Sequence, residues 1–321
     1  MDKKEIRKTA NRVGAGLLVY EGILLFVVAA HIVFDMACAL VRSAELRENE
    51  ELYNAFVEEY LVQFSERAVS TIIAVLLGTA FLFFFFRKTI RPKDLLQENR
   101  KMTAKKLFQF VCLFLGTQLI FDIVGLALEA GLNCFGLTAV ESIEAATSES
   151  TTISMFLYAC IVGPIVEELV YRGFVLHSFQ KYGKMFALIV SAALFGIMHG
   201  NLPQGIFAFG VGLILGYVAM EYSLVWSIVL HIINNMVICD LLSYLIRGFS
   251  EKVQNNILTG IFIFGAAASI IIIWKKRKTV AAYIKTNKSE KKQYLYLLTS
   301  IALIIFVGMQ MFIALSAITP L

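Results

Sequence analysis

Long apolar stretches that contain almost no charge constrain this chain more than any other feature. Hydrophobic residues make up 58% of its 321 residues and the mean hydropathy is +0.73, whereas soluble domains are about 45–50% apolar. A run of roughly 18 apolar residues is long enough to span a bilayer. We therefore expect nine membrane spans, at about 13–40, 69–86, 107–128, 152–181, 185–199, 204–220, 224–239, 256–274 and 295–316.

All of these spans should be helices, because only helices and closed barrels satisfy the backbone in lipid. The segments are too long and too uniformly apolar for barrel strands. The expected fold class is an all-α polytopic membrane protein with a bundle of about eight to nine transmembrane helices. We expect one membrane domain, 1–321, with a functional core at 152–240 and additional transmembrane helices at 1–150 and 241–321.

Charge and cysteine patterns indicate where the chain resides. Most of the 29 lysines and arginines fall on one side of the expected spans, so the positive-inside rule places the N-terminus in the cytoplasm. The net charge of +5 lies in loops, where it reports topology and not nucleic-acid binding. The five cysteines are scattered without a C-x-x-C motif, which argues against a disulfide framework. The short loops favour an integral protein of a bacterial plasma membrane, with the lipid bilayer as a partner.

Two adjacent carboxylates and an arginine interrupt the fourth span, in the stretch GPIVEELVYRG at 163–173. A charge at membrane depth costs about 2.5–3.5 kcal/mol per residue, so such groups indicate a functional site by default. Glu168 and Arg172 are i and i+4 and can pair. Glu167 is rotated by about 100° and would be left free as a general base. The alternative is a buried ion pair that only fixes helix packing. Pro164 should also bend this long span.

Three later polar groups should reach the same layer of the membrane. His199 ends the fifth span, and His231 and Asn235 are i and i+4 in the seventh. With turns at Gly183 and Tyr222 on one side, a rise of 1.5 Å per residue puts Glu167 and His199 both about 24 Å from their turn. The same count puts Asn235 about 20 Å and His231 about 14 Å from theirs. We expect these groups to converge.

This set of side chains offers no activated nucleophile and fits hydrolysis by water. Glu167 would deprotonate the water, and His199 would position it. His231 and Asn235 would donate hydrogen bonds to the oxyanion. Two histidines and a glutamate can also form a catalytic Zn²⁺ site, with Glu167, His199 and His231 as the ligands if a metal is used. The H-E-x-x-H spacing is absent, so the cofactor stays open between Zn²⁺ and none.

The ordered motifs resemble a known family. The chain contains E-E-x-x-x-R, then F-x-x-x-H, then H-x-x-x-N in successive membrane helices, at Glu167, Glu168, Arg172, Phe195, His199, His231 and Asn235. This order resembles the CPBP intramembrane protease family, which includes type II CAAX prenyl endopeptidases and bacteriocin-immunity proteins. The resemblance covers about residues 155–240.

The resemblance implies endoproteolysis of peptide bonds in or near the membrane. It implies that Glu167 is the main catalytic carboxylate, that His199 works with it, and that His231 and Asn235 form the oxyanion hole. Glu168 and Arg172 would support them. The family is usually called metalloprotease, although a metal-free glutamate mechanism is also argued for it.

We therefore expect an intramembrane endopeptidase that acts on a membrane-associated or lipid-modified peptide, or on a small membrane protein. The alternatives are a non-enzymatic bacteriocin-immunity or partner-sequestering protein and a proton-coupled transporter. A transporter predicts matching broken helices in both halves of the chain, and the sequence shows only the Gly163-Pro164 break.

Overall fold

Helices form almost all of the regular structure in the computed structural model of the chain, which describes residues 3–43, 49–65, 68–87, 97–147 and 152–321. The longer helices are α1 (Lys3–Arg42), α2 (Glu50–Ser65), α3 (Val69–Phe86), α5 (Ala104–Asn133), α10 (Lys184–Ile197), α11 (Leu202–Glu221), α14 (Glu251–Thr286) and α16 (Ile301–Ser316). Shorter helices are α6 (Val140–Thr147), α13 (Leu242–Ile246) and α15 (Lys291–Leu297). The strands β1 (Leu137–Thr138) and β2 (Thr319–Pro320) pair antiparallel.

Two further helices are built from alternating α- and π-helical segments. The first runs through α7 (Ile153–Leu157), η2 (Tyr158–Val162), α8 (Gly163–Glu168), η3 (Leu169–Leu176) and α9 (His177–Gln180). The second runs through α12 (Leu224–Ile232), η4 (Ile233–Leu241) and α13. The predicted bend at Pro164 is a change of hydrogen bonding inside a continuous helix, because Ile153–Gln180 counts as one span.

The all-helical membrane bundle predicted from the sequence is confirmed, with a smaller number of spans. Within the described residues, seven helices are long and apolar enough to cross a membrane, and the bent pair of α15 and α16 makes an eighth if counted as one span. The predicted fifth span is the short α10, which ends at Ile197 and so ends before His199. The chain is thus an integral membrane protein.

The predicted last span, 295–316, is broken near its start. α15 and α16 meet at an angle of 78°. The hydroxyl of Ser300 accepts the Leu303 N–H and so caps α16, while it donates to the side chain of Asn11 at 2.9 Å. The Asn11 carbonyl oxygen also accepts the Ala302 N–H. A contact from α1 therefore fixes this corner, which hydropathy alone does not reveal.

Local capping sets where the central helices begin. The side chains of Thr152, Asn201 and Ser223 each accept a backbone N–H from the first turn of the helix that follows, which satisfies donors that have no partner within the helix. Gly200 has φ +58° at the turn between α10 and α11, a conformation that favours glycine. Gly200 and Asn201 therefore form the short turn before α11, and Ser223 lies in the short turn after it.

The turns at Gly183 and Tyr222 lie at the same end of the bundle, as the counting argument requires. Lys184, which begins α10, donates to Glu221 at the end of α11 at 2.6 Å. Arg100 pairs with the same carboxylate at 2.9 Å, and the Tyr283 hydroxyl donates to it at 3.0 Å. This cluster joins α10, α11 and α14 at one end, so residues equally far from the turns on α10 and α12 lie at similar depth.

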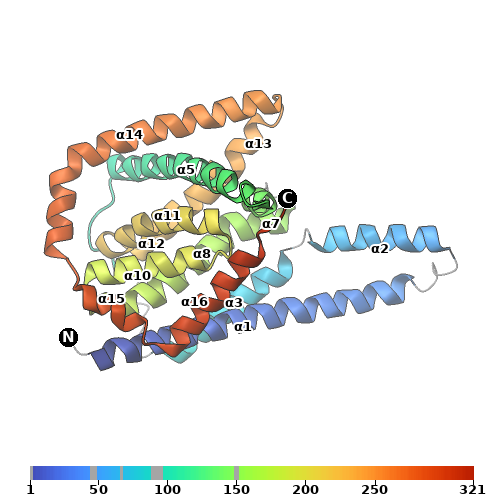
Figure 1. Cartoon of the computed structure of the whole chain (residues 1–321), viewed down its shortest axis with the longest axis horizontal. Coiled ribbons are helices and arrows are strands. Elements are labelled where there is room, and N and C mark those ends of the chain that lie inside the picture. Colours follow the sequence, from blue (N-terminus) through green and yellow to red (C-terminus); the bar gives the residue numbers. More distant parts are fainter. Residues whose placement is uncertain (1–2, 44–48, 66–67, 88–96, 148–151) are drawn as a thin grey trace.

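Two apolar clusters flank the helix that carries the Glu167-Glu168 pair. One joins the first half of α1 to η3, α10 and α16, and the other joins α5, α11 and α12. The second half of α1 and all of α2 extend beyond the bundle (Figure 1), and the buried residues of α1 all lie between Ile6 and Tyr20. The core of the protein is therefore built from the first half of α1, from α3 and α5, and from the helices that follow residue 152.

A close approach of α1 to α16 gives a test of this packing. A Cβ added at Gly14 would collide with the backbone of Ala302 and Leu303, whereas one added at Gly22, also in α1, meets nothing within 4 Å. We expect Gly14→Ala to destabilise the protein by about 1–3 kcal/mol, the usual cost of overpacking, and Gly22→Ala to cause no loss. Unfolding in mixed micelles measures both, and equal effects of the two variants would contradict this packing.

Candidate active site

The candidate site lies where the two π-containing helices meet. In η2 the N–H of Gly163 donates to the carbonyl of Tyr158, five residues earlier. In a π-helix each N–H bonds to the carbonyl five residues earlier, so the Ala159 carbonyl would bond to the N–H of residue 164. That residue is Pro164, which has no N–H. The Asn235 side chain of η4 supplies this donor, with its Nδ2 2.9 Å from the Ala159 oxygen. The proline thus frees a carbonyl that ties the two helices together, and π-helical segments are frequent at functional sites.

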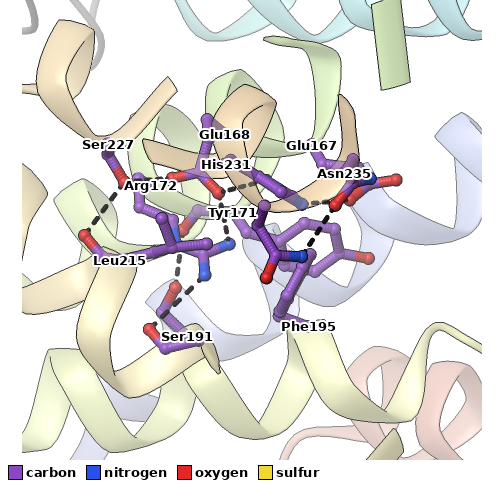
Figure 2. A network of polar contacts seen from close by, with 12 residues as sticks. Glu167, Glu168, Tyr171, Arg172, Ser191, Phe195, Leu215, Ser227, His231 and Asn235 are labelled. Carbon is purple, nitrogen blue, oxygen red and sulfur yellow. Dashed lines mark hydrogen bonds and ion pairs between the residues drawn. The ribbon is translucent and has the colours of Figure 1, made fainter. Parts of the chain in front are cut away.

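Glu168 is the centre of a buried polar network (Figure 2). Its side chain is fully buried, and its Oε1 lies 3.2 Å from Arg172 Nη1, so the predicted i, i+4 pair is confirmed. The same oxygen lies 3.0 Å from His231 Nδ1. The Ser227 hydroxyl donates to Oε2. Both carboxylate oxygens of Glu168 are therefore engaged in contacts within the protein. The contacts with Ser227 and His231 were not predicted from the sequence.

Arg172 contacts two other helices besides its pairing with Glu168. Its side chain is completely buried, its Nη2 donates to the Gly212 carbonyl of α11 at 3.4 Å, and its guanidinium carbon lies 4.2 Å above the ring of Phe195 in α10. A cation over an aromatic face is attracted by the ring quadrupole. Arg172 is thus enclosed by protein and acts on the site through Glu168.

Glu167 differs from its neighbour in exposure. Its side chain is 20% exposed, against 0% for Glu168. Its Oε2 lies 3.7 Å from His231 Nε2, while the other ring nitrogen of His231 contacts Glu168. The two adjacent carboxylates therefore point in different directions, as the helical rotation between them predicts, and His231 lies between them. Glu167 is thus the more exposed of the two carboxylates.

His199 has a defined tautomer. Its Nδ1 lies 2.8 Å from the carbonyl oxygen of Phe195, and a carbonyl can only accept, so Nδ1 carries the proton. In the neutral ring Nε2 is then an acceptor. The His199 ring also packs edge-on against the Phe195 ring, with centroids 5.0 Å apart, and the Phe195 ring does the same with His231 at 5.8 Å. Phe195 therefore orients both histidines.

The structure brings all six predicted residues to one region. Glu167, Glu168, Arg172 and His231 interact directly. Asn235 is connected to the helix of Glu167 by its hydrogen bond to the Ala159 carbonyl. Its side-chain oxygen also accepts the Asn234 side-chain N–H at 3.0 Å. His199 contacts the Phe195 ring, which also contacts His231, and it lies within electrostatic range of Glu167.

Sequence reasoning missed a shell of tyrosines around Glu167. Tyr20, Tyr158 and Tyr171 all lie within electrostatic range of its carboxylate. Tyr171 is fully buried and its hydroxyl has no hydrogen-bond partner within the described residues. Tyr171 lies at i+4 from Glu167, and this spacing predicts that the two side chains share one face of the helix. Tyr20 comes from α1, more than 100 residues away in the sequence, and no local pattern indicates it.

The sequence offers Glu167, His199 and His231 as a ligand set if a metal is used. Among the residues that the structure describes, no three His, Cys, Asp or Glu side chains are grouped so that they could hold a metal ion. His231 instead directs Nδ1 to Glu168 and keeps Nε2 3.7 Å from Glu167. The use of Glu167, His199 and His231 as metal ligands thus stays a prediction, as does the metal-free reaction.

Two comparisons with known proteins found a similarity. Residues 149–237 match the family model described as "Type II CAAX prenyl endopeptidase Rce1-like", and this range contains all six candidate residues. A similar protein is the "Putative membrane peptidase YdiL" of Bacillus subtilis (strain 168), which is 25% identical over 114 residues. That match covers 34% of this chain and 47% of the relative, about half its length. No solved structure matches the chain significantly.

Proposed function

We propose that this integral membrane protein is an endopeptidase that hydrolyses peptide bonds of a membrane-associated substrate, because residues 149–237 match the family model of the Rce1-like type II CAAX prenyl endopeptidases. One observation carries the proposal. Two adjacent glutamates have separate environments, one fully buried with an arginine and one partly exposed beside a histidine. This division supplies a fixed support and a free base within one helical turn.

In the proposed reaction Glu167 takes a proton from a water molecule while the water oxygen bonds to the carbonyl carbon of the substrate. The π electron pair of the carbonyl moves to its oxygen and gives a tetrahedral intermediate. When the intermediate collapses, the carbon–nitrogen bond breaks. The proton held by Glu167 passes to the leaving nitrogen, so the products are a carboxylic acid and an amine. General acid–base catalysis of this kind contributes about 10²–10⁴-fold.

Two histidines would have different tasks. The Nε2 of His199 accepts a hydrogen bond from the attacking water, because its Nδ1–H is held by the Phe195 carbonyl. His231 would carry protons on both ring nitrogens, donating Nδ1–H to Glu168 and Nε2–H to the oxyanion. Asn235 has a second amide N–H besides the one given to Ala159, and it would be the other oxyanion donor. Preorganised donors of this kind stabilise the transition state.

The proposed substrate is an apolar peptide that enters from the bilayer. Its peptide bond must reach Glu167 inside a helical bundle whose neighbouring surfaces are apolar, and the matched family is described as a prenyl endopeptidase. A small membrane protein or a lipid-modified peptide satisfies both requirements.

The function is tested with purified protein in proteoliposomes and a library of quenched hydrophobic peptides. We expect the wild-type protein to cleave a subset of the library, and an arm with a metal chelator decides between the metal-dependent and the metal-free form of the reaction. Absence of cleavage by folded protein across the library would favour a partner-binding or immunity role. Proton-driven uptake without cleavage would favour the transporter.

A further inference from the structure

A cavity of about 430 Å³ lies between the start of α1 and the end of α9, away from the Glu167 site. This volume falls in the range of ligand pockets, roughly 300–1,000 Å³. The cavity is lined by Thr9, Arg12 and Val13 from α1, and by His177, Ser178, Gln180 and Lys181 from α9 and its cap. The spacings i, i+3 and i+4 on α1, and i, i+4 on α9, place these residues on two facing helix surfaces.

The lining is basic and rich in hydrogen-bond donors. Arg12, His177 and Lys181 bring cationic or donor nitrogens, and among the residues that the structure describes no aspartate or glutamate lines the cavity. Ser178 adds a buried hydroxyl and Gln180 an amide. Arginine offers a planar fork that matches phosphate oxygens, and lysine adds a point charge. The chemistry that this set recognises is that of a phosphate group with adjacent hydroxyls.

The cavity lies where an apolar surface meets a basic one. The Arg12 guanidinium lies 4.8 Å from the centre of the Phe86 ring at the end of α3, and the preceding Phe84 and Phe85 are largely exposed. Aromatic residues are enriched at the level of the lipid headgroups, and basic pockets between transmembrane helices bind anionic headgroups. Val13 gives the cavity one apolar wall.

We propose that this cavity binds the phosphodiester headgroup of an anionic membrane phospholipid. Arg12 and Lys181 hold the phosphate oxygens, and the donors of Ser178 and Gln180 hold the remaining headgroup oxygens. The acyl chains lie along the exposed aromatic end of α3. Thr9 of α1 already forms a hydrogen bond with the Tyr182 hydroxyl, just after α9, at 2.7 Å. The bound headgroup adds further contacts between these two parts of the chain. The ligand thus joins α1 to the helix that carries Glu167.

The test compares phosphatidylglycerol with phosphatidylcholine as additives to the full-length protein in neutral detergent. Binding is measured by native mass spectrometry, and the unfolding midpoint is measured with each lipid. We expect phosphatidylglycerol to bind and to raise the midpoint, and phosphatidylcholine to do neither. Glycerol 3-phosphate forms a third arm. If it binds as tightly as phosphatidylglycerol, the site takes soluble phosphates and the lipid assignment is overturned.

The variants locate the site. Each Lys or Arg near an anionic headgroup contributes about a factor of five in binding, so the double variant Arg12→Gln, Lys181→Gln should bind phosphatidylglycerol about 30-fold more weakly. Lys275→Gln, Lys278→Gln removes two exposed charges from α14 and should leave binding unchanged. If the double variant unfolds early without lipid, the single variant Lys181→Met replaces it, because Lys181 is exposed. Equal loss in the α14 control would overturn the proposal.

Discussion

Replacing Arg172 by methionine is expected to lower the free energy of unfolding by about 3–5 kcal/mol. The substitution leaves the fully buried Glu168 carboxylate without its 3.2 Å partner, and an uncompensated buried charge is strongly destabilising. It also removes the cation above the Phe195 ring. The measurement is reversible unfolding in mixed micelles.

A double-mutant cycle separates the charge from the packing. Adding Glu168→Gln to Arg172→Met removes the unpaired charge and should recover part of the lost stability, since replacing both members of a buried pair is often tolerated. The exposed pair of Lys292 and Glu290, 3.0 Å apart, is the matched control. Lys292→Met should have no measurable effect on unfolding. Additive effects at 168 and 172 would show that the two residues do not interact as described.

Replacing Glu167 by glutamine is expected to lower kcat by about 10²–10⁴-fold while the unfolding midpoint stays near that of the wild type. Glutamine keeps the shape of the side chain and cannot take a proton from water. Because Glu167 is 20% exposed and pairs with no arginine within the described part of the chain, its charge contributes little to the fold. The control is Glu251→Gln, at the exposed start of α14, which should leave both quantities unchanged.

The same substitution one residue later should have the opposite profile. Glu168→Gln weakens the contacts with Arg172 and His231, so it should lower stability and, through the orientation of His231, activity. If Glu167→Gln destabilised the protein as much as Glu168→Gln, the division of tasks between the two glutamates would be wrong.

Much of the fold and the convergence of the site follow from the sequence, because hydropathy and helical rise act on the chain locally. Counting 1.5 Å per residue from two turns placed His199 and His231 near the depth of Glu167, and the i, i+4 spacing gave the Glu168–Arg172 pair. The count worked because Lys184 and Glu221 join the two turns at one end of the bundle.

What the sequence did not indicate depends on contacts between distant segments. The corner at Ser300 needs Asn11 of α1, and the tie from Asn235 to Ala159 needs two π-helical segments from different helices. The second segment, η4, contains no proline, so its sequence does not predict the change from α-helical to π-helical hydrogen bonding. The three tyrosines near Glu167 come from two helices, with Tyr20 in α1 and Tyr158 and Tyr171 in the helix of Glu167 itself, and only Tyr171 has a local spacing signal.

The central claim is that water activated by Glu167 cleaves a peptide bond, and the most direct test is the mass of the products formed in water labelled with heavy oxygen. Wild-type protein and the Glu167→Gln variant are incubated with the same hydrophobic peptide in proteoliposomes. The account predicts new peptide C-termini that carry the label with the wild type and none above background with the variant. Labelled products formed equally by both proteins, or by neither, would contradict it.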